Sequence, residues 1–287
     1  MTERSVTARA LPLCVVLTSL VLAGCSGNGP SLGWFSDDDT YEPDVSDVGA
    51  PEDLYNEGLA LLNEGSVTRA SEKFEEVDEL HPFSDYARRA TLLAAYSHFE
   101  RGDYDNAIAS ASRFVQLNPG SSDAAYAQFL IGESYFRQIE TIDRDQSAAE
   151  RAAAVMADLA ERYPDSEYAP QARQRVRVAR DQLAGKEMEI GRSYQRRGQY
   201  LGALNRYRVV VGEYQTTRHI EEALLRLTET YLALGVVSEA QTAAAVLGHN
   251  FPDSQWYRDA YSVLQSGGFE PAINDQSWLA SVFDRVS

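Results

Sequence analysis

The hydrophobic positions of this chain recur with the period of an α-helix, and the regular alternation that is typical of strands is nearly absent. Residues 121–138 give one example, in which Ala125, Phe129, Gly132 and Phe136 fall on one helical stripe. The pattern predicts an all-α protein whose helices are joined by short turns.

One helical hairpin recurs along the chain with the same internal distances. Its turn reads Gly-x-Tyr or Gly-x-Val and then x-x-Ala. Glycine can end the first helix in the left-handed conformation, and the small alanine lets the second helix lie close. The four copies of this turn begin at Gly65, Gly102, Gly198 and Gly235. Twelve residues after the alanine, three copies have a proline, which stops the second helix.

A serine or threonine two residues beyond that position can cap the next helix. A fifth copy keeps the step from Ala152 to Pro164 and has the following serine, but a polar insertion at residues 139–146 replaces its glycine turn. The predicted cap residues are Ser84, Ser121, Ser166, Thr217 and Ser254.

The distance between adjacent copies indicates the fold. The first two copies of the glycine turn are 37 residues apart, as are the last two, which is close to the roughly 34-residue period of tetratricopeptide repeats. We predict a right-handed superhelical array of five tetratricopeptide-like hairpins with a C-terminal capping helix. The hairpins are expected at residues 51–83, 84–120, 121–165, 166–216 and 217–253, and the cap at 254–265.

Two further segments depart from the repeat. The helix expected at residues 166–198 is unusually long, with Gly185 as its only candidate kink. Residues 266–287 follow the cap as a C-terminal tail, in which Trp278, Leu279, Val282 and Phe283 can form a short amphipathic stripe.

The first residues have the pattern of a secretory signal. Arg4 and Arg9 precede an apolar run at residues 11–23, which is short for a membrane span. The run ends in Leu22-Ala23-Gly24-Cys25, which resembles the lipobox of bacterial lipoproteins. An ordinary signal peptide is the alternative. We expect a signal peptide at residues 1–24 and a lipidated flexible tether at 25–50, with the covalent lipid on Cys25 as the only attached group.

The lipobox also indicates a location. In such lipoproteins an aspartate after the cysteine commonly retains the protein at the inner membrane, and this chain has Ser26 there. By that rule we expect a lipid anchor in the outer membrane of a Gram-negative bacterium, on the periplasmic face.

Charge excludes one class of partner and suggests another. The formal net charge of −17 argues against nucleic acid as a ligand. Residues 171–218 nevertheless carry eleven basic and four acidic side chains, a net charge of +7, whereas the rest of the chain is at −24. This segment can attract an acidic surface, although arginine-rich helices also occur simply as solvated faces.

The search for catalytic groups favours a protein that is not an enzyme. The four histidines lack the spacing of a zinc motif, and lipidation removes the cysteine as a nucleophile, so we expect no metal and no cofactor. Glu133 and Ser134 match the Glu-Ser pair of lytic transglycosylases, but the downstream motifs of those enzymes are absent.

Binding is the remaining interpretation. Stacked hairpins form a concave groove lined by the first helix of each repeat, which suits extended peptides. The aromatic candidates for this groove are Tyr55, Tyr96, Phe99 and Tyr126. Aromatic residues at helical spacing also pack between helices, so each candidate has a core role as its alternative.

The lipobox, acidic tether, five hairpins and long helix together resemble the BamD family, lipoproteins of the β-barrel assembly machinery. The resemblance covers essentially the whole mature chain. Its more particular motifs are Tyr55-x-x-Gly58 with Ala70-x-x-x-Phe74, Asp143-Arg144-Asp145, and Arg197-Gly198 followed by Asn205-Arg206. Departures are Gln215 at a closing-proline position and the long tail.

The resemblance implies a scaffold that promotes the folding and insertion of outer-membrane proteins. The resemblance also implies that the N-terminal hairpins engage unfolded outer-membrane proteins. It implies that the C-terminal hairpins bind the periplasmic domains of a barrel subunit like BamA. Other lipoproteins of the complex are implied as partners. The candidate barrel-subunit contacts are Arg196, Arg197, Arg206 and Arg208. The alternative is a tetratricopeptide lipoprotein for secretin assembly or division-linked peptidoglycan synthesis.

Overall fold

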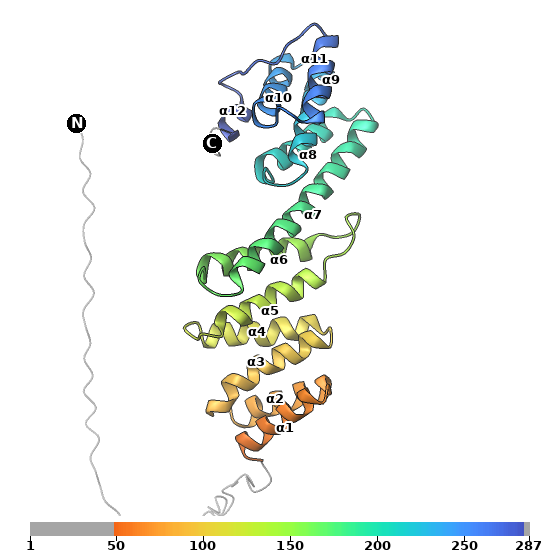
Figure 1. Cartoon of the computed structure of the whole chain (residues 1–287). Coiled ribbons are helices and arrows are strands. Elements are labelled where there is room, and N and C mark those ends of the chain that lie inside the picture. Colours follow the sequence, from red (N-terminus) through yellow and green to blue (C-terminus); the bar gives the residue numbers. More distant parts are fainter. Residues whose placement is uncertain (1–48, 284–287) are drawn as a thin grey trace, which may run out of the picture. The chain divides into compact units, whose positions relative to one another are not determined.

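The described part of the chain is entirely helical. The computed structural model describes residues 49–283, which form twelve helices and no strand (Figure 1). The helices are α1 (Pro51–Asn63), α2 (Val67–Leu80), α3 (Asp85–Glu100), α4 (Tyr104–Leu117), α5 (Ala124–Arg137), α6 (Ser147–Arg162), α7 (Ala169–Arg196), α8 (Tyr200–Glu213), α9 (Ile220–Ala233), α10 (Val237–Asn250), α11 (Gln255–Ser266) and α12 (Trp278–Phe283). The predicted signal peptide, Cys25 and most of the tether lie outside the described residues.

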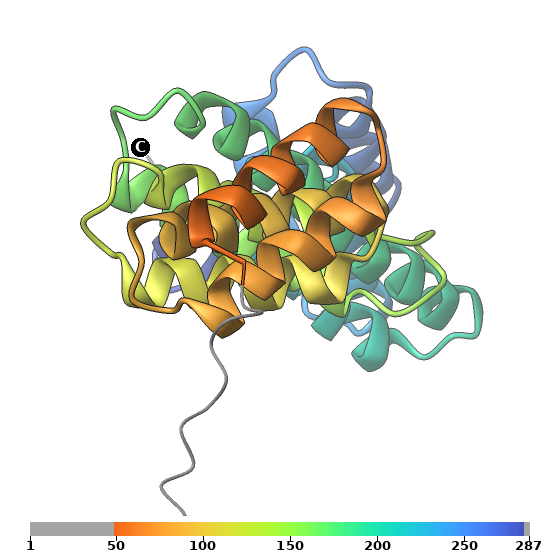
Figure 2. The same cartoon turned by 90° about the horizontal axis from the view of Figure 1, so that it is seen from below.

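Neighbouring helices pack against each other along the chain, as α1 and α2 illustrate at the N-terminal end of the array (Figure 2). The odd-numbered helices α1, α3, α5 and α7 also contact one another in that order. The predicted all-α class is confirmed. The hand of the superhelix and the count of five hairpins stay predictions. Within residues 49–283, none of the helices combines the length and apolar character that a membrane span requires.

The glycine turns have the predicted left-handed backbone. Gly65, Gly102, Gly198 and Gly235 have φ angles of 71–79°, a region that favours glycine. The residue after each glycine donates its backbone N–H to the carbonyl five residues before it, at 2.8–3.0 Å. This is the hydrogen bond of the Schellman motif, which satisfies a carbonyl at the helix end.

The predicted capping residues are right at two helices and wrong at three. Ser84 and Ser254 have extended backbones, and their side chains accept hydrogen bonds from the first turns of α3 and α11. The helices that follow Ser121, Ser166 and Thr217 begin three residues after these predicted caps, at Ala124, Ala169 and Ile220. There the residue directly before the helix has an αR backbone, so the chain enters the helix through an additional turn and the predicted cap residue lies too early.

Glycines on the first helices make room for large side chains on the second helices. A Cβ at Gly58 would lie 2.6 Å from Phe74, and a Cβ at Gly191 would lie 2.5 Å from Tyr207. Both aromatic residues are fully buried. The helices of these two hairpins can therefore approach closely only because the first helix has no side chain at the contact.

The insertion at residues 139–146 is fastened to α7. Lys186 Nζ donates to the Asp143 carbonyl oxygen at 3.0 Å, and Gln182 Nε2 donates to the Glu140 carbonyl oxygen at 3.1 Å. α7 runs without a break through Gly185, the candidate kink, where a Cβ would lie 2.7 Å from Ile142 of the insertion. Gly185 thus provides space for the loop.

The C-terminal segment folds back onto the last repeats. Leu279 in α12 is fully buried, and α12 contacts α10. The Gln241 side chain donates to the Glu270 carbonyl oxygen at 2.7 Å, and the Ser277 hydroxyl donates to Glu239 at 2.7 Å. The predicted stripe of the tail therefore covers an apolar face of the repeats.

Candidate partner-binding surfaces

The basic segment lies on α7, α8 and the turns that follow each of them. Arg206 on α8 forms an ion pair with Glu187 on α7, with Nη1 3.2 Å from Oε2, while 41% of its side chain stays exposed. A half-exposed pair of this kind holds the guanidinium in place and leaves part of it accessible to another protein.

The other three candidate arginines have different neighbours. Arg196 lies 3.6 Å from Glu189, and the Arg197 guanidinium lies 5.0 Å from the ring centre of Tyr194. Arg208 lies over the ring of Trp278 at 4.6 Å. Each guanidinium is thus oriented by its own contact.

The structure does not bring the four arginines into one cluster. Arg206 and Arg208 are two residues apart on α8, which directs them to roughly opposite sides of the helix. Arg196 follows Glu187, the partner of Arg206, by about two and a half turns of α7, which also places it on the opposite side. The basic segment therefore offers more than one surface.

Sequence reasoning missed an ion-pair network between α7 and α9. Arg192 Nη1 lies 3.0 Å from Glu222, and Arg226 bridges Glu222 and Glu229 at 3.3 and 2.9 Å. The spacing of Glu222, Arg226 and Glu229 on one helix could have indicated it. A cavity of about 270 Å³ beside the network is lined by Arg192, Gln195, Arg196 and Arg226.

The aromatic candidates form a row along the first helices. Tyr55 on α1 packs against Phe74 and Tyr86, with ring centres 5.8 and 5.4 Å apart. Tyr126 on α5 contacts Tyr168, just before α7, at 5.3 Å. Sequence reasoning missed Tyr168, which lies in the turn before α7. Tyr55 and Tyr126 are thus partly used in packing between repeats.

Burial and charge raise the pKa of two phenols of this row, Tyr96 and Tyr126. Burial raises the pKa of Tyr126, and burial together with the nearby Glu100 carboxylate raises the pKa of Tyr96. Phe99 is half-buried against Tyr104, with ring centres 5.8 Å apart. The row therefore offers aromatic rings and hydroxyl groups, beside which Glu100 supplies negative charge.

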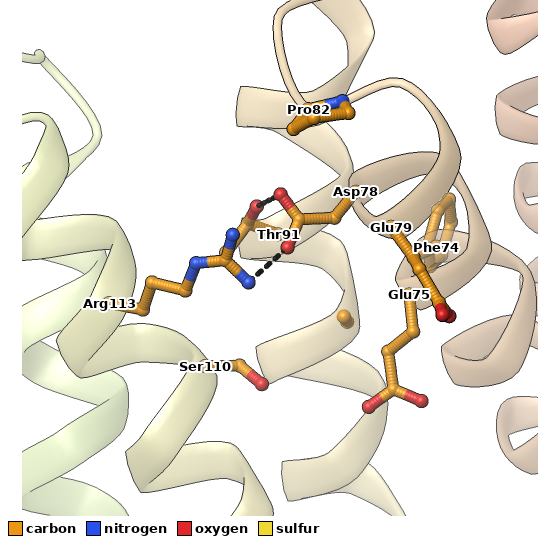
Figure 3. Close-up of a pocket in the computed structure, with 9 residues that line it drawn as sticks. Phe74, Glu75, Asp78, Glu79, Pro82, Thr91, Ser110 and Arg113 are labelled. Atoms are coloured by element: carbon orange, nitrogen blue, oxygen red, sulfur yellow. Dashed lines mark hydrogen bonds and ion pairs between the residues drawn. The ribbon is translucent and has the colours of Figure 1, made fainter. Parts of the chain in front are cut away.

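A cavity of about 540 Å³ lies between α2, α3 and α4 (Figure 3). Glu75, Asp78 and Glu79 line it from α2. Asp78 accepts a hydrogen bond from Thr91 at 3.4 Å and forms an ion pair with Arg113. Two side chains of the protein, Thr91 and Arg113, thus already bind the Asp78 carboxylate in this cavity.

Glu133 has the environment of a structural residue. It is 4% exposed, and both carboxylate oxygens accept hydrogen bonds from Arg175 at 2.7 and 2.9 Å. Arg137 donates to the same carboxylate at 3.1 Å. Two guanidinium groups occupy the oxygens that a catalytic acid would present to a substrate. Residues 49–283 contain no group of three or more side chains arranged to hold a metal ion.

Comparison with known proteins gives consistent matches. The family model described as "YfiO: Outer membrane lipoprotein" matches residues 48–247. A protein named outer membrane protein assembly factor BamD from Caulobacter vibrioides is 41% identical over 92% of this chain and 83% of its own length. Proteins of the same name from Rickettsia prowazekii and from Neisseria meningitidis serogroup A are 35% and 32% identical, over 88% and 87% of this chain and 95% and 94% of their own lengths.

Proposed function

This chain belongs to the BamD family of outer-membrane lipoproteins, and on that basis we propose that it assists the assembly of outer-membrane proteins as a non-enzymatic scaffold. We place it at the outer membrane, anchored through a lipid on Cys25 and facing the periplasm. Family membership disfavours the alternative functions in secretin assembly and peptidoglycan synthesis.

The uneven distribution of charge is the observation that carries the proposed mechanism. Residues 171–218 have a net charge of +7 in a chain whose total is −17. Such a basic surface on an acidic protein can steer and orient an acidic partner. We propose that the partner is a barrel subunit like BamA, bound through its periplasmic domains, and that other lipoproteins of the complex bind elsewhere.

Arg206 is the arginine on which we test this docking. Arg206→Glu is expected to weaken co-purification of the barrel subunit by about tenfold, because the substitution reverses a partly exposed charge at the proposed interface. Cross-linking from a photoreactive amino acid at position 206 in the intact envelope, followed by mass spectrometry, identifies the captured protein.

A matched variant separates docking from the internal ion pair. Glu187→Gln removes the partner of Arg206 but keeps the arginine, and it is expected to leave co-purification within about twofold of wild type. Equal losses in both variants would mean that Arg206 serves only the pair with Glu187. Capture of a secretin or a peptidoglycan synthase would move the function to the alternative.

The aromatic row is the proposed contact for unfolded outer-membrane proteins. Its rings lie on successive first helices, as an extended peptide would require. A photoreactive amino acid in place of Tyr96 is expected to capture unfolded outer-membrane proteins, whereas one in place of the exposed Leu117 on α4 is not. Equal capture from both positions would show that binding does not depend on this row.

A further inference from the structure

The outward stripe of α8 has an unusual composition for a solvated face. Leu201, Asn205 and Arg208 recur at the spacing of one helical stripe, and all three are exposed. Leu201 has 67% of its surface accessible, although leucine is normally among the most buried residues. An exposed apolar side chain therefore lies two turns from a cation on the same face of α8.

The C-terminal segment supplies the aromatic end of this stripe. Trp278 of α12 lies beside Arg208, with the guanidinium carbon 4.6 Å from the ring centre. The ring is fixed in place, because Trp278 Nε1 donates to the Tyr231 hydroxyl at 2.9 Å and the next residue, Leu279, is fully buried. Trp278 is therefore a fixed platform.

Stacking orients an arginine without using its hydrogen-bond donors. The guanidinium binds the ring through its face, and its N–H groups point outward in the plane, where they can meet a carboxylate. Because the ring restricts the side chain before binding, less conformational entropy is lost when a partner arrives. Arg208 and Trp278 are also the residue types most enriched at energetic centres of protein interfaces.

We propose that Leu201, Asn205, Arg208 and Trp278 form one docking surface for an acidic surface patch of a partner protein, with Trp278 as the positioning residue for Arg208. The exposed guanidinium of Arg208, in a segment whose net charge is +7, supports an acidic partner. This inference rests on the proposed function, whose barrel subunit is the partner meant, and it adds the C-terminal segment to the interface.

The first test examines the stack in the free, full-length protein. Arginine side-chain NMR reports the Nε–H of Arg208, whose resonance is expected to be shifted by the Trp278 ring current. Trp278→Ala is expected to move that resonance to the position of an unstacked arginine, whereas Trp278→Phe is expected to keep most of the shift. An unchanged resonance in Trp278→Ala would overturn the positioning role.

The second test measures affinity for the purified periplasmic domains of the barrel subunit. Arg208→Ala and Trp278→Ala are each expected to weaken binding by about fivefold or more, and the double variant is expected to be little worse than either single variant. Leu201→Ser is expected to weaken binding similarly, whereas Leu117→Ser, at an equally exposed leucine on α4, is not. Arg151→Ala, which removes an arginine over the ring of Tyr135, is the matched cation–π control.

The outcomes separate this inference from the proposed function. If Arg206→Glu weakens binding but the variants at positions 201, 208 and 278 do not, the docking surface assigned here is wrong and the proposed function stands. If Arg206→Glu also binds like wild type, both are overturned. Thermal unfolding of Trp278→Ala, compared with Trp278→Phe, which keeps an aromatic ring, checks that a loss in Trp278→Ala does not come from a detached tail.

Discussion

Replacing Phe74 with alanine is expected to lower the free energy of unfolding by about 3–5 kcal/mol. Phe74 is fully buried between α1 and α3, in a cluster with Leu61, Val77 and Ala90. Gly58, which makes room for the ring, has no side chain that could refill the space. The cavity would therefore persist, and cavities that cannot collapse give the larger losses.

Urea unfolding followed by circular dichroism measures this loss. Phe83→Ala is the matched control, because the Phe83 side chain is fully exposed in the turn after α2 and its removal is expected to change stability by less than about 0.5 kcal/mol. Similar effects of the two substitutions would contradict the packing described for the first hairpin. Hydrogen exchange would then locate the change, since repeat arrays can unfold in parts.

The second large effect is expected at the buried ion pair between α5 and α7. Arg175→Met should destabilise the protein by about 3 kcal/mol, because it leaves the Glu133 carboxylate buried with only Arg137 as an ionic partner. The expected loss lies at the lower end of the usual range because 24% of the Arg175 side chain is exposed.

Two further variants test the cause of this loss. Arg137→Met removes a more exposed partner of the same carboxylate and is expected to cost less than about 1 kcal/mol. The double variant Glu133→Leu/Arg175→Met replaces both charges with apolar groups and should recover most of the loss, as measured by urea unfolding. Failure to recover would indicate that the contact of the Arg175 guanidinium with the Phe136 ring matters more than the pair.

Features that depend on a few adjacent residues were predictable from the sequence. The turn glycines were predictable, because a positive φ is a local requirement that few other residues meet. The caps at Ser121, Ser166 and Thr217 were not, because the alternative turn at these places uses nearly the same residues and differs only in backbone angles. The amphipathic stripe that contains Leu279 was also predictable, but the helices on which it packs were not, since the C-terminal segment belongs to no repeat.

The candidate surfaces were predictable as composition but not as geometry. The count of arginines indicated a basic surface, yet the partners of Arg206 and Arg208 lie 19 and 70 residues away in sequence. The opposite directions of these two arginines follow from their spacing on α8. The platform at Trp278 and the buried pair of Glu133 with Arg175 required the tertiary structure.

The contact between Gly58 and Phe74 also bears on how such arrays change over time. At the positions equivalent to Gly58 and Phe74, the second hairpin has Ala95 and Ala111, and both alanines are fully buried, as Phe74 is. A recombination that joined the first helix of one hairpin to the second helix of the other would put glycine against alanine and leave a void, or alanine against phenylalanine and create a collision. The heritable module is consequently a whole hairpin, and crossovers that fall within its turn should be lost from evolving populations.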